Sequence, residues 1–249
     1  MQLTNAHTLA LAGTTFLLAG FVKGVIGLGL PTIAMGLLGT LMPPAAAASL
    51  LIVPSLVTNV WQLATGPRFT GLLRRLWTMM AGIVLGTLAG AGLTQGDHDG
   101  VATMMLGGAL VIYAAVGLAA LRFVVPARAE WWLNPMVGTA TGLVTAATGV
   151  FVIPAVPYLG ALGFSKDETI QALGLSFTIS TLALAAGLTR AGAFDFPTAG
   201  ASFIALVPAL VGMALGGWVR RRVSELMFRR CFFLGLLALG AHLAMRDVI

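Results

Sequence analysis

Charged residues are scarce in this chain: Asp, Glu, Lys and Arg make up only 9% of the 249 residues, whereas hydrophobic residues make up 58%. A soluble domain carries about 25% charged residues, so the deficit indicates an integral membrane protein in a lipid bilayer. The eight acidic residues all fall between or beyond the long apolar runs. This position argues against a cation exporter, which needs buried carboxylates. The net charge of +6 belongs to loops and gives no reason to expect nucleic acid as a partner.

Cysteine and histidine are also rare. The single Cys231 excludes a disulfide within the chain. The three histidines are isolated, without an HExxH motif or a Cys/His cluster, so we expect neither a metal site nor a cofactor. The motif GxSxG and the P-loop are absent as well. The sequence therefore gives no indication of an enzyme or of an ATPase within the chain.

What the chain has in abundance is apolar runs long enough to cross a bilayer as helices, for which about 20 residues are needed. Six runs are uninterrupted, at 44–64, 77–93, 101–123, 171–188, 198–219 and 226–245, and two more, 7–41 and 134–164, are interrupted. The alternating pattern of a lipid-facing β-strand is missing. The expected fold class is an all-α integral membrane protein with about eight membrane segments.

Both interrupted runs are broken by glycine and proline at corresponding places. The first break lies in GFVKGVIGLGLP, from Gly20 to Pro31, and the second in GLVTAATGVFVIP, from Gly142 to Pro154. Backbone polar groups in lipid must be hydrogen-bonded, so irregular backbone at membrane depth survives where it is enclosed in protein or lines a cavity. Two such breaks at matching positions are typical of the substrate site of a secondary transporter.

The two breaks also align with each other. A shift of 122 residues superposes three identical pairs, Gly20/Gly142, Val22/Val144 and Gly27/Gly149. Each half then contains one interrupted run followed by three uninterrupted spans. We therefore predict a single membrane domain, 1–249, that consists of two repeats, 1–125 and 126–249.

Basic residues indicate how the runs cross, because basic loops remain on the cytoplasmic side. If both interrupted runs crossed once, the basic loop residues would divide seven to six between the two sides. If the second run instead enters and leaves on one side as a re-entrant hairpin, eleven lie inside and only Arg190 and Arg246 outside. The eleven are Arg68, Arg74, Arg75, Arg122, Arg128, Lys166, Arg220, Arg221, Arg222, Arg229 and Arg230. The hairpin is favoured, with two arms of about 15 residues that are too short to cross.

For the first run, the re-entrant topology is supported by the repeat alone. The alternative is a first run that spans the membrane. With both runs re-entrant, the halves are inverted repeats, each a broken helical hairpin plus three transmembrane helices. The hairpin tips are then expected to meet near the midplane, with both termini periplasmic.

Lys23 is the one charged residue deep inside an apolar run, since Arg122, Arg229 and Arg230 lie within five residues of the end of theirs. An ammonium group at bilayer depth costs at least about 2.5 kcal/mol, and no acid lies in any span to neutralise it. One interpretation is that Lys23 attracts an anionic substrate at the break. The other is that it reaches an interface or pairs with backbone carbonyls.

The breaks themselves suit an anion, because a helix N-terminus presents unpaired N–H groups and a partial positive charge. Helices that restart after each break would point two such ends into one pocket, where glycine admits close approach of a ligand. The predicted substrate-binding backbone consists of Gly24, Gly27, Gly29, Pro31, Gly149 and Pro154. The alternative is that these glycines only permit close helix packing.

Uncharged polar side chains are further candidates. The predicted ligands are Asn59 and Gln62, which share a face of the 44–64 span with Ser55 and Thr58, and Thr145 and Thr148, which stand where Lys23 and Ile26 stand in the first half. The equivalent span of the second half carries Ser176, Thr178, Ser180 and Thr181. The alternative for all of them is hydrogen bonding between helices or to the carbonyls of their own helix.

Together these motifs resemble the TauE/SafE sulfite exporter family of bacterial membrane transporters. The resemblance covers essentially the whole chain and rests on GFVKGVIGLGLPTIAMGLLG, PPAAAASLLIVPSLVTNVWQ and TGLVTAATGVFVIPAVPYLGALGFSKDETIQALGLSF. It implies a multi-pass permease of the bacterial inner membrane with repeated halves that moves sulfite, sulfonates or related organic anions. It also implies coupling to an ion gradient. Because the spans hold no carboxylate, a coupled proton would travel on the substrate itself.

The sequence thus predicts a secondary transporter for a small anion, coupled to a proton or another ion, without a cofactor and compatible with a homo-oligomer. The alternative is a passive anion channel with the same pocket, which would conduct without saturation or counter-transport. A membrane-embedded enzyme is disfavoured because no nucleophile–base pair is present.

Overall fold

The computed structural model describes residues 6–91, 99–119, 124–220, 222 and 224–246, and within these ranges every regular element is a helix. Six helices are long and apolar enough to cross a membrane, at Pro44–Ala64 (α3), Phe69–Gly90 (α4), Gly100–Ala119, Lys166–Arg190 (α8), Phe196–Val219 (α9) and Leu226–Met245. The third and the last belong to α5 (Asp99–Ala119) and α10 (Glu225–Met245). The all-α membrane fold class and its six uninterrupted spans are confirmed.

The two interrupted runs fold into pairs of unequal helices. The first forms α1 (Ala6–Ile26) and α2 (Leu30–Gly39), and the second forms α6 (Glu130–Thr148) and α7 (Ala155–Gly160), after a single 3-10 turn, η1 (Ala127–Ala129). The prediction of two similar arms of about 15 residues in the second run is wrong. Helix α6 has 19 residues, a length of about 28 Å, and α7 has only six. The predicted apolar run began at Asn134. Helix α6 begins four residues earlier, at Glu130, whose carboxylate pairs with Arg75.

The second interrupted run begins and ends at the same end of the bundle. The guanidinium of Arg75 contacts both Glu130 at the start of α6 and the carbonyl oxygen of Leu162 beyond α7, the latter at 3.1 Å. The Val125 N–H also donates to the Ala161 carbonyl at 3.0 Å. This arrangement is the geometry of a hairpin.

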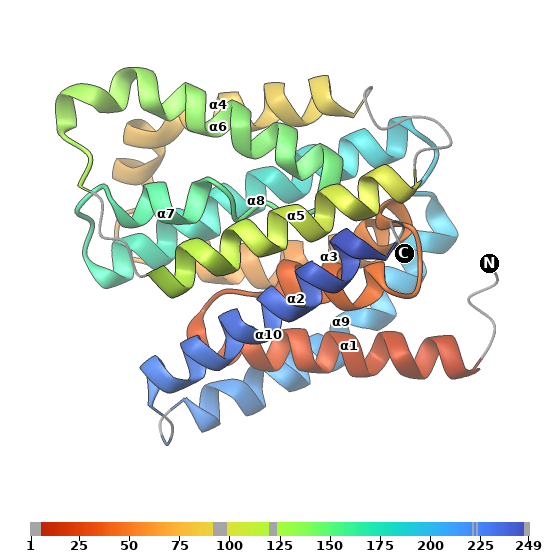
Figure 1. Ribbon diagram of the computed structural model, residues 1–249. Coiled ribbons are helices and arrows are strands. Elements are labelled where there is room, and N and C mark those ends of the chain that lie inside the picture. The colour runs from red at the N-terminus through yellow and green to blue at the C-terminus, as the bar shows by residue number, and fades with distance from the viewer. Residues whose placement is uncertain (1–5, 92–98, 120–123, 221, 223, 247–249) are drawn as a thin grey trace.

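Most described basic residues lie toward this end, which we call the basic end. Arg68 pairs there with Glu168 at 2.9 Å, and the end of α9 and the start of α10 lie on the same side (Figure 1). Its basic residues are Arg68, Arg74, Arg75, Arg128, Lys166, Arg220, Arg222, Arg229 and Arg230. At the opposite end Arg246 donates to the Thr40 carbonyl at 3.1 Å, and Arg190 closes α8. Arg122 and Arg221 lie outside the described residues.

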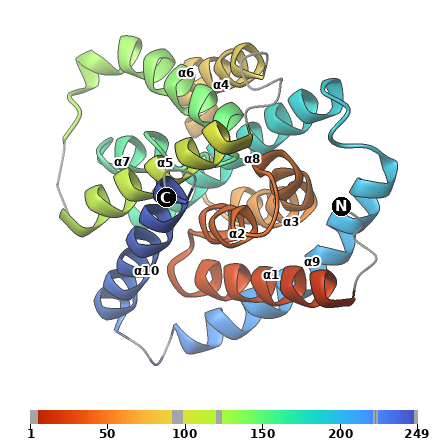
Figure 2. The same cartoon turned by 45° about the vertical axis from the view of Figure 1, so that its right-hand side comes forward.

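Helices α3 and α8 run antiparallel through the centre, with the other helices around them (Figures 1 and 2). Two glutamines connect them near the basic end: Gln62 donates to the Ile170 carbonyl and Gln171 to the Leu63 carbonyl, each at 2.9 Å. Helix α3 contains an internal proline, Pro54, which has no N–H to donate to the Leu50 carbonyl. The Leu50 carbonyl instead accepts from Ser202 Oγ of α9 at 2.8 Å.

Glycine brings two parallel helix pairs into backbone contact, α1 with α9 and α4 with α6. A Cβ at Gly20 or Gly24 would collide with backbone atoms of α9, and a Cβ at Gly82 or Gly86 with backbone atoms of α6. Small residues four apart allow helices in a membrane to approach this closely. Each pair joins one helix from each half of the chain.

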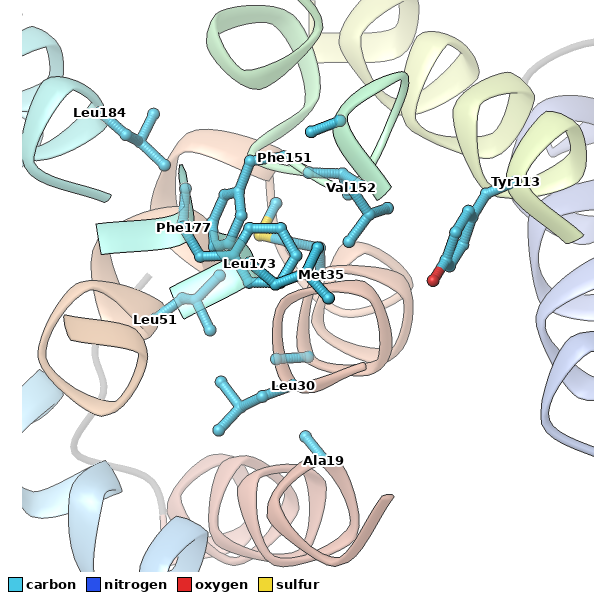
Figure 3. Close-up of a cluster of buried hydrophobic side chains, with 14 of the residues drawn as sticks. Ala19, Leu30, Met35, Leu51, Tyr113, Phe151, Val152, Leu173, Phe177 and Leu184 are labelled. Atoms are coloured by element: carbon cyan, nitrogen blue, oxygen red, sulfur yellow. The ribbon is translucent and has the colours of Figure 1, made fainter. Parts of the chain in front are cut away.

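The second break is part of the hydrophobic core. Residues Val150, Phe151 and Val152, which connect α6 to α7, are at most 1% exposed. Phe151 packs against Phe177 of α8, with ring centroids 5.2 Å apart, and Met35 of α2 lies beside them (Figure 3). Protein therefore encloses the irregular backbone, as membrane depth requires.

Candidate functional site around Lys23

The ammonium group of Lys23 lies inside the bundle. The residue belongs to the last turn of α1 and is 5% exposed. Its Nζ donates to Thr58 Oγ1 at 3.0 Å and to Asn59 Oδ1, both on α3. Lys23 therefore neither extends to an interface nor pairs with backbone carbonyls; its partners are side chains of a central helix.

These partners continue a buried polar network toward α8. Asn59 Nδ2 donates to Ser55 Oγ at 3.0 Å, and Ser55 Oγ lies 3.2 Å from Thr181 Oγ1. Because the Thr181 proton is used on the Phe177 carbonyl at 2.7 Å, Ser55 is the donor to Thr181. The network thus runs from α1 through α3 to α8, with every donor assigned.

Neutral oxygens are the ammonium group's only hydrogen-bond partners among the described residues. The described ion pairs are Arg68–Glu168 and Arg75–Glu130, both at the basic end. A lysine ammonium has three N–H donors, and two of them are used here. With respect to the residues that the structure describes, Lys23 therefore retains one donor and an uncompensated positive charge, the two properties that a small oxyanion needs from a binding site.

The first break adjoins Lys23 in sequence and has the backbone that its glycines predict. Gly27 and Gly29 have φ of 76° and 104°, a region that favours glycine, and Pro31 lies in the first turn of α2. No atom lies within 4 Å of a Cβ built on Gly27. A Cβ on Gly29 would meet Val22 and Phe232.

The second break differs from the first. Gly149 has φ of 69°, and a Cβ there would meet the side chains of Met35 and Ala48. Pro154 directly precedes α7, which has six residues. A helix of six residues has only a small dipole to direct at a ligand. The N-termini of α2 and α7 are therefore not equivalent anion sites.

Gly24, a predicted site residue, faces away from this network. A Cβ at Gly24 would collide with the Met213 carbonyl of α9, so helix packing accounts for this glycine. Gln62 lies near the basic end, where it lines a cavity of about 320 Å³ together with Thr65, Gly66, Pro67, Asp167 and Ile170. The structure therefore brings Lys23 and Asn59 together but places Gln62 at a separate position.

The hydroxyls of Thr145 and Thr148 are bound to their own helix. Each donates at 2.7 Å to the carbonyl four residues earlier, Thr141 and Val144 respectively. Thr148 Oγ1 also accepts from the Val150 N–H at 3.1 Å, which closes the end of α6. Both oxygens can still accept, but neither has a proton left to donate to an anion.

Three members of the Lys23 network, Ser55, Thr58 and Thr181, were not among the predicted ligands. The signal for Ser55 and Thr58 was the polar face of α3, where positions 55, 58, 59 and 62 follow helical spacing. Thr181 belongs to the polar group of the equivalent span in the second half. The sequence does not say which helix that face meets, because the contact between α1 and α3 joins residues 35 positions apart.

The protein-family model for the sulfite exporter TauE/SafE matches residues 12–243. Neither the curated proteins nor the solved structures contain a match to this chain.

Proposed function

Because the chain belongs to the sulfite exporter TauE/SafE family, a family of transporters, we propose that it is a secondary transporter of the bacterial inner membrane that carries a small anion. The cargo belongs to the class of sulfite, organosulfonates and related organic acids. The observation that carries this proposal is the buried ammonium of Lys23, which has only neutral partners among the described residues.

The proposed anion contact is the remaining N–H of Lys23, next to the first break. Asn59 and Thr58 hold the ammonium in place through two hydrogen bonds. Gly27, one helical turn after Lys23 in the chain, has no neighbouring atom within 4 Å of its Cβ position, and α2 begins at Leu30 with its N-terminus at the break. The positive charge of Lys23 and the N-terminal end of the α2 dipole therefore both attract the anion.

We further propose that the halves 1–125 and 126–249 are inverted repeats that move against each other in alternating access. The shared offset supports this proposal: the ends of α1 and α6, and the starts of α3 and α8, are each 122 residues apart. The helix packing also supports this proposal, because α1 packs against α9 in the same way as α6 packs against α4.

A thermal-unfolding screen of the detergent-purified protein tests the cargo class. Sulfite, thiosulfate, sulfoacetate, taurine and simple carboxylates are added as potassium salts and compared with potassium chloride at equal ionic strength. A ligand that binds only the folded protein raises its apparent stability by mass action, so at least one sulfur-containing anion is expected to raise the Tm. No response to any of these anions would contradict the proposal.

Flux into proteoliposomes then separates a transporter from a channel. We expect saturable uptake of the stabilising anion that accelerates when the same anion is present inside. Uptake that rises linearly with concentration and shows no counter-transport would identify a passive channel instead.

A further inference from the structure

The number of hydrogen-bond acceptors around Lys23 matches a neutral amine. Its Nζ donates to Thr58 Oγ1 at 3.0 Å and to Asn59 Oδ1, and to no other atom of the described residues. A neutral amine has two N–H groups and a lone pair, whereas an ammonium group has three N–H groups. The two acceptors on α3 therefore satisfy every N–H of the amine but leave one N–H of the ammonium group without a partner.

Both acceptors keep this role whether Lys23 is charged or neutral. Thr58 uses its own hydroxyl proton on the Pro54 carbonyl at 2.7 Å, so its oxygen offers only lone pairs to Lys23. The amide of Asn59 is held in one orientation, because its Nδ2 donates to Ser55 Oγ at 3.0 Å. The site can therefore hold the amine and the ammonium group without rearrangement of α3.

The helices around Lys23 provide no described acidic side chain as a counter-charge. Helices α2, α3 and α9 contain no titratable residue within their bounds. The other titratable residue of α1 is His7, 16 residues earlier, or about 24 Å along the helix. Helix α10 meets α1 where the rings of Phe228 and Phe21 lie 6.1 Å apart. Its titratable residues are Glu225, which is its first residue, the exposed Arg229, Arg230 and Cys231, and the exposed His242 near its end.

Anion binding changes the balance between the two forms of Lys23. A buried charge without a partner is so costly that such a group neutralises instead, which favours the amine in the empty site. A bound anion supplies the counter-charge and accepts the third N–H, and a charge-assisted hydrogen bond of this kind is strong. Anion binding and protonation of Lys23 therefore favour each other.

Lys23 is also the group best placed to carry a proton with the anion. Two described acids form ion pairs at the basic end, Glu130 with Arg75 and Glu168 with Arg68. In the second half, the offset of 122 residues places Thr145 at the position of Lys23, and threonine does not titrate. The two halves together thus contribute one proton-binding side chain at this position.

We propose that Lys23 carries the coupled proton of the transporter. On the loading side, the lone pair of the amine takes a proton from water as the anion binds, so that one N–H bond forms and one O–H bond breaks. On the release side, the anion leaves and the ammonium group returns this proton to water. A monovalent anion then crosses without net charge. The inference rests on the proposed function and deepens it, because it assigns the coupled proton to Lys23 instead of to the substrate.

Proton uptake during anion binding tests this assignment. The purified full-length protein is titrated with thiosulfate or sulfoacetate at about pH 8.5, where neither anion takes up a proton. Calorimetry in two buffers of different ionisation enthalpy gives the number of protons bound. We expect about one proton per bound anion. Because the proton and the anion bind together, anion affinity should fall about tenfold for each unit rise in pH above this value.

Lys23→Arg is the matched variant, because a guanidinium group does not release its proton in proteins. It should bind the anion without proton uptake, with an affinity that does not depend on pH. Lys166 is the other lysine of the chain and is exposed in the first turn of α8. Lys166→Arg should therefore take up the same number of protons as the unaltered protein.

Two results would overturn the assignment of the proton to Lys23. The first is anion binding by the unaltered protein without proton uptake, which leaves the proposed anion transport intact. The second is uptake that persists in Lys23→Arg, or that accompanies sulfite but neither of the two anions that do not titrate. The absence of binding by all of these anions would contradict the proposed function itself.

Discussion

Arg75 and Glu130 form a two-pronged ion pair, in which Nε lies 2.7 Å from Oε2 and Nη2 lies 2.6 Å from Oε1. The same guanidinium donates to the Leu162 carbonyl and lies 4.5 Å from the centroid of the Phe164 ring. One residue of α4 thus connects the first residue of α6 with the segment that follows α7. This contact fixes the base of the second hairpin at the basic end.

Arg75→Met is therefore expected to lower the free energy of unfolding by about 1–3 kcal/mol. The substitution leaves the carboxylate of Glu130, whose side chain is only 12% exposed, without its partner. Denaturant unfolding in detergent measures the change. The neighbouring Arg74 is exposed and takes part in neither of the described ion pairs, so Arg74→Met is the control. Equal losses in the two variants would show that the ion pair does not stabilise the hairpin.

Gly86→Ala tests the close contact of α4 with α6. A Cβ at Gly86 would collide with the carbonyl of Thr139, so the two helices must separate and the protein should become less stable. Gly71 lies on the same helix with no atom within 4 Å of its Cβ position, and Gly71→Ala should be neutral or stabilise by up to about 1 kcal/mol. Thermal unfolding of both variants gives the comparison. A stable Gly86→Ala protein would contradict backbone contact between these helices.

Asn59→Asp tests the electrostatics of the Lys23 site. The two side chains are nearly the same size, but aspartate places a negative charge beside the ammonium and neutralises it. The folded protein should remain stable, whereas the Tm rise caused by the stabilising anion should disappear, because carboxylate and anion compete for one positive charge. Asn59→Gln keeps the site neutral and is the control. An unchanged anion response in Asn59→Asp would place the anion away from Lys23.

The long spans could be predicted from hydropathy because each is one apolar run with polar ends. The prediction of 44–64 agrees with α3 to the residue. Hydropathy predicted that the next span starts at residue 77, whereas α4 begins at Phe69. Arg74 and Arg75 lower the hydropathy of that first stretch, and the ion pair with Glu130 that stabilises Arg75 there is not visible in a local pattern.

The candidate site was only partly accessible to sequence reasoning. The absence of acids in the apolar runs and the single lysine inside one of these runs identified Lys23, and helical spacing identified the face of α3 that receives it. Whether a glycine serves a ligand or a neighbouring helix depends on the partner helix. Gly24 and Gly27 look alike in sequence, but Gly24 meets α9 and Gly27 has open space around it.

Anion binding by Lys23→Met, followed as the Tm shift of the purified protein in potassium salts, is the most direct test of the Lys23 site. Lys23→Arg retains the positive charge and serves as the matched variant. We expect the methionine variant to fold but to lose the Tm shift produced by the stabilising anion, while the arginine variant keeps part of it. A methionine variant with the Tm shift of the unaltered protein would show that the buried ammonium does not bind the transported anion.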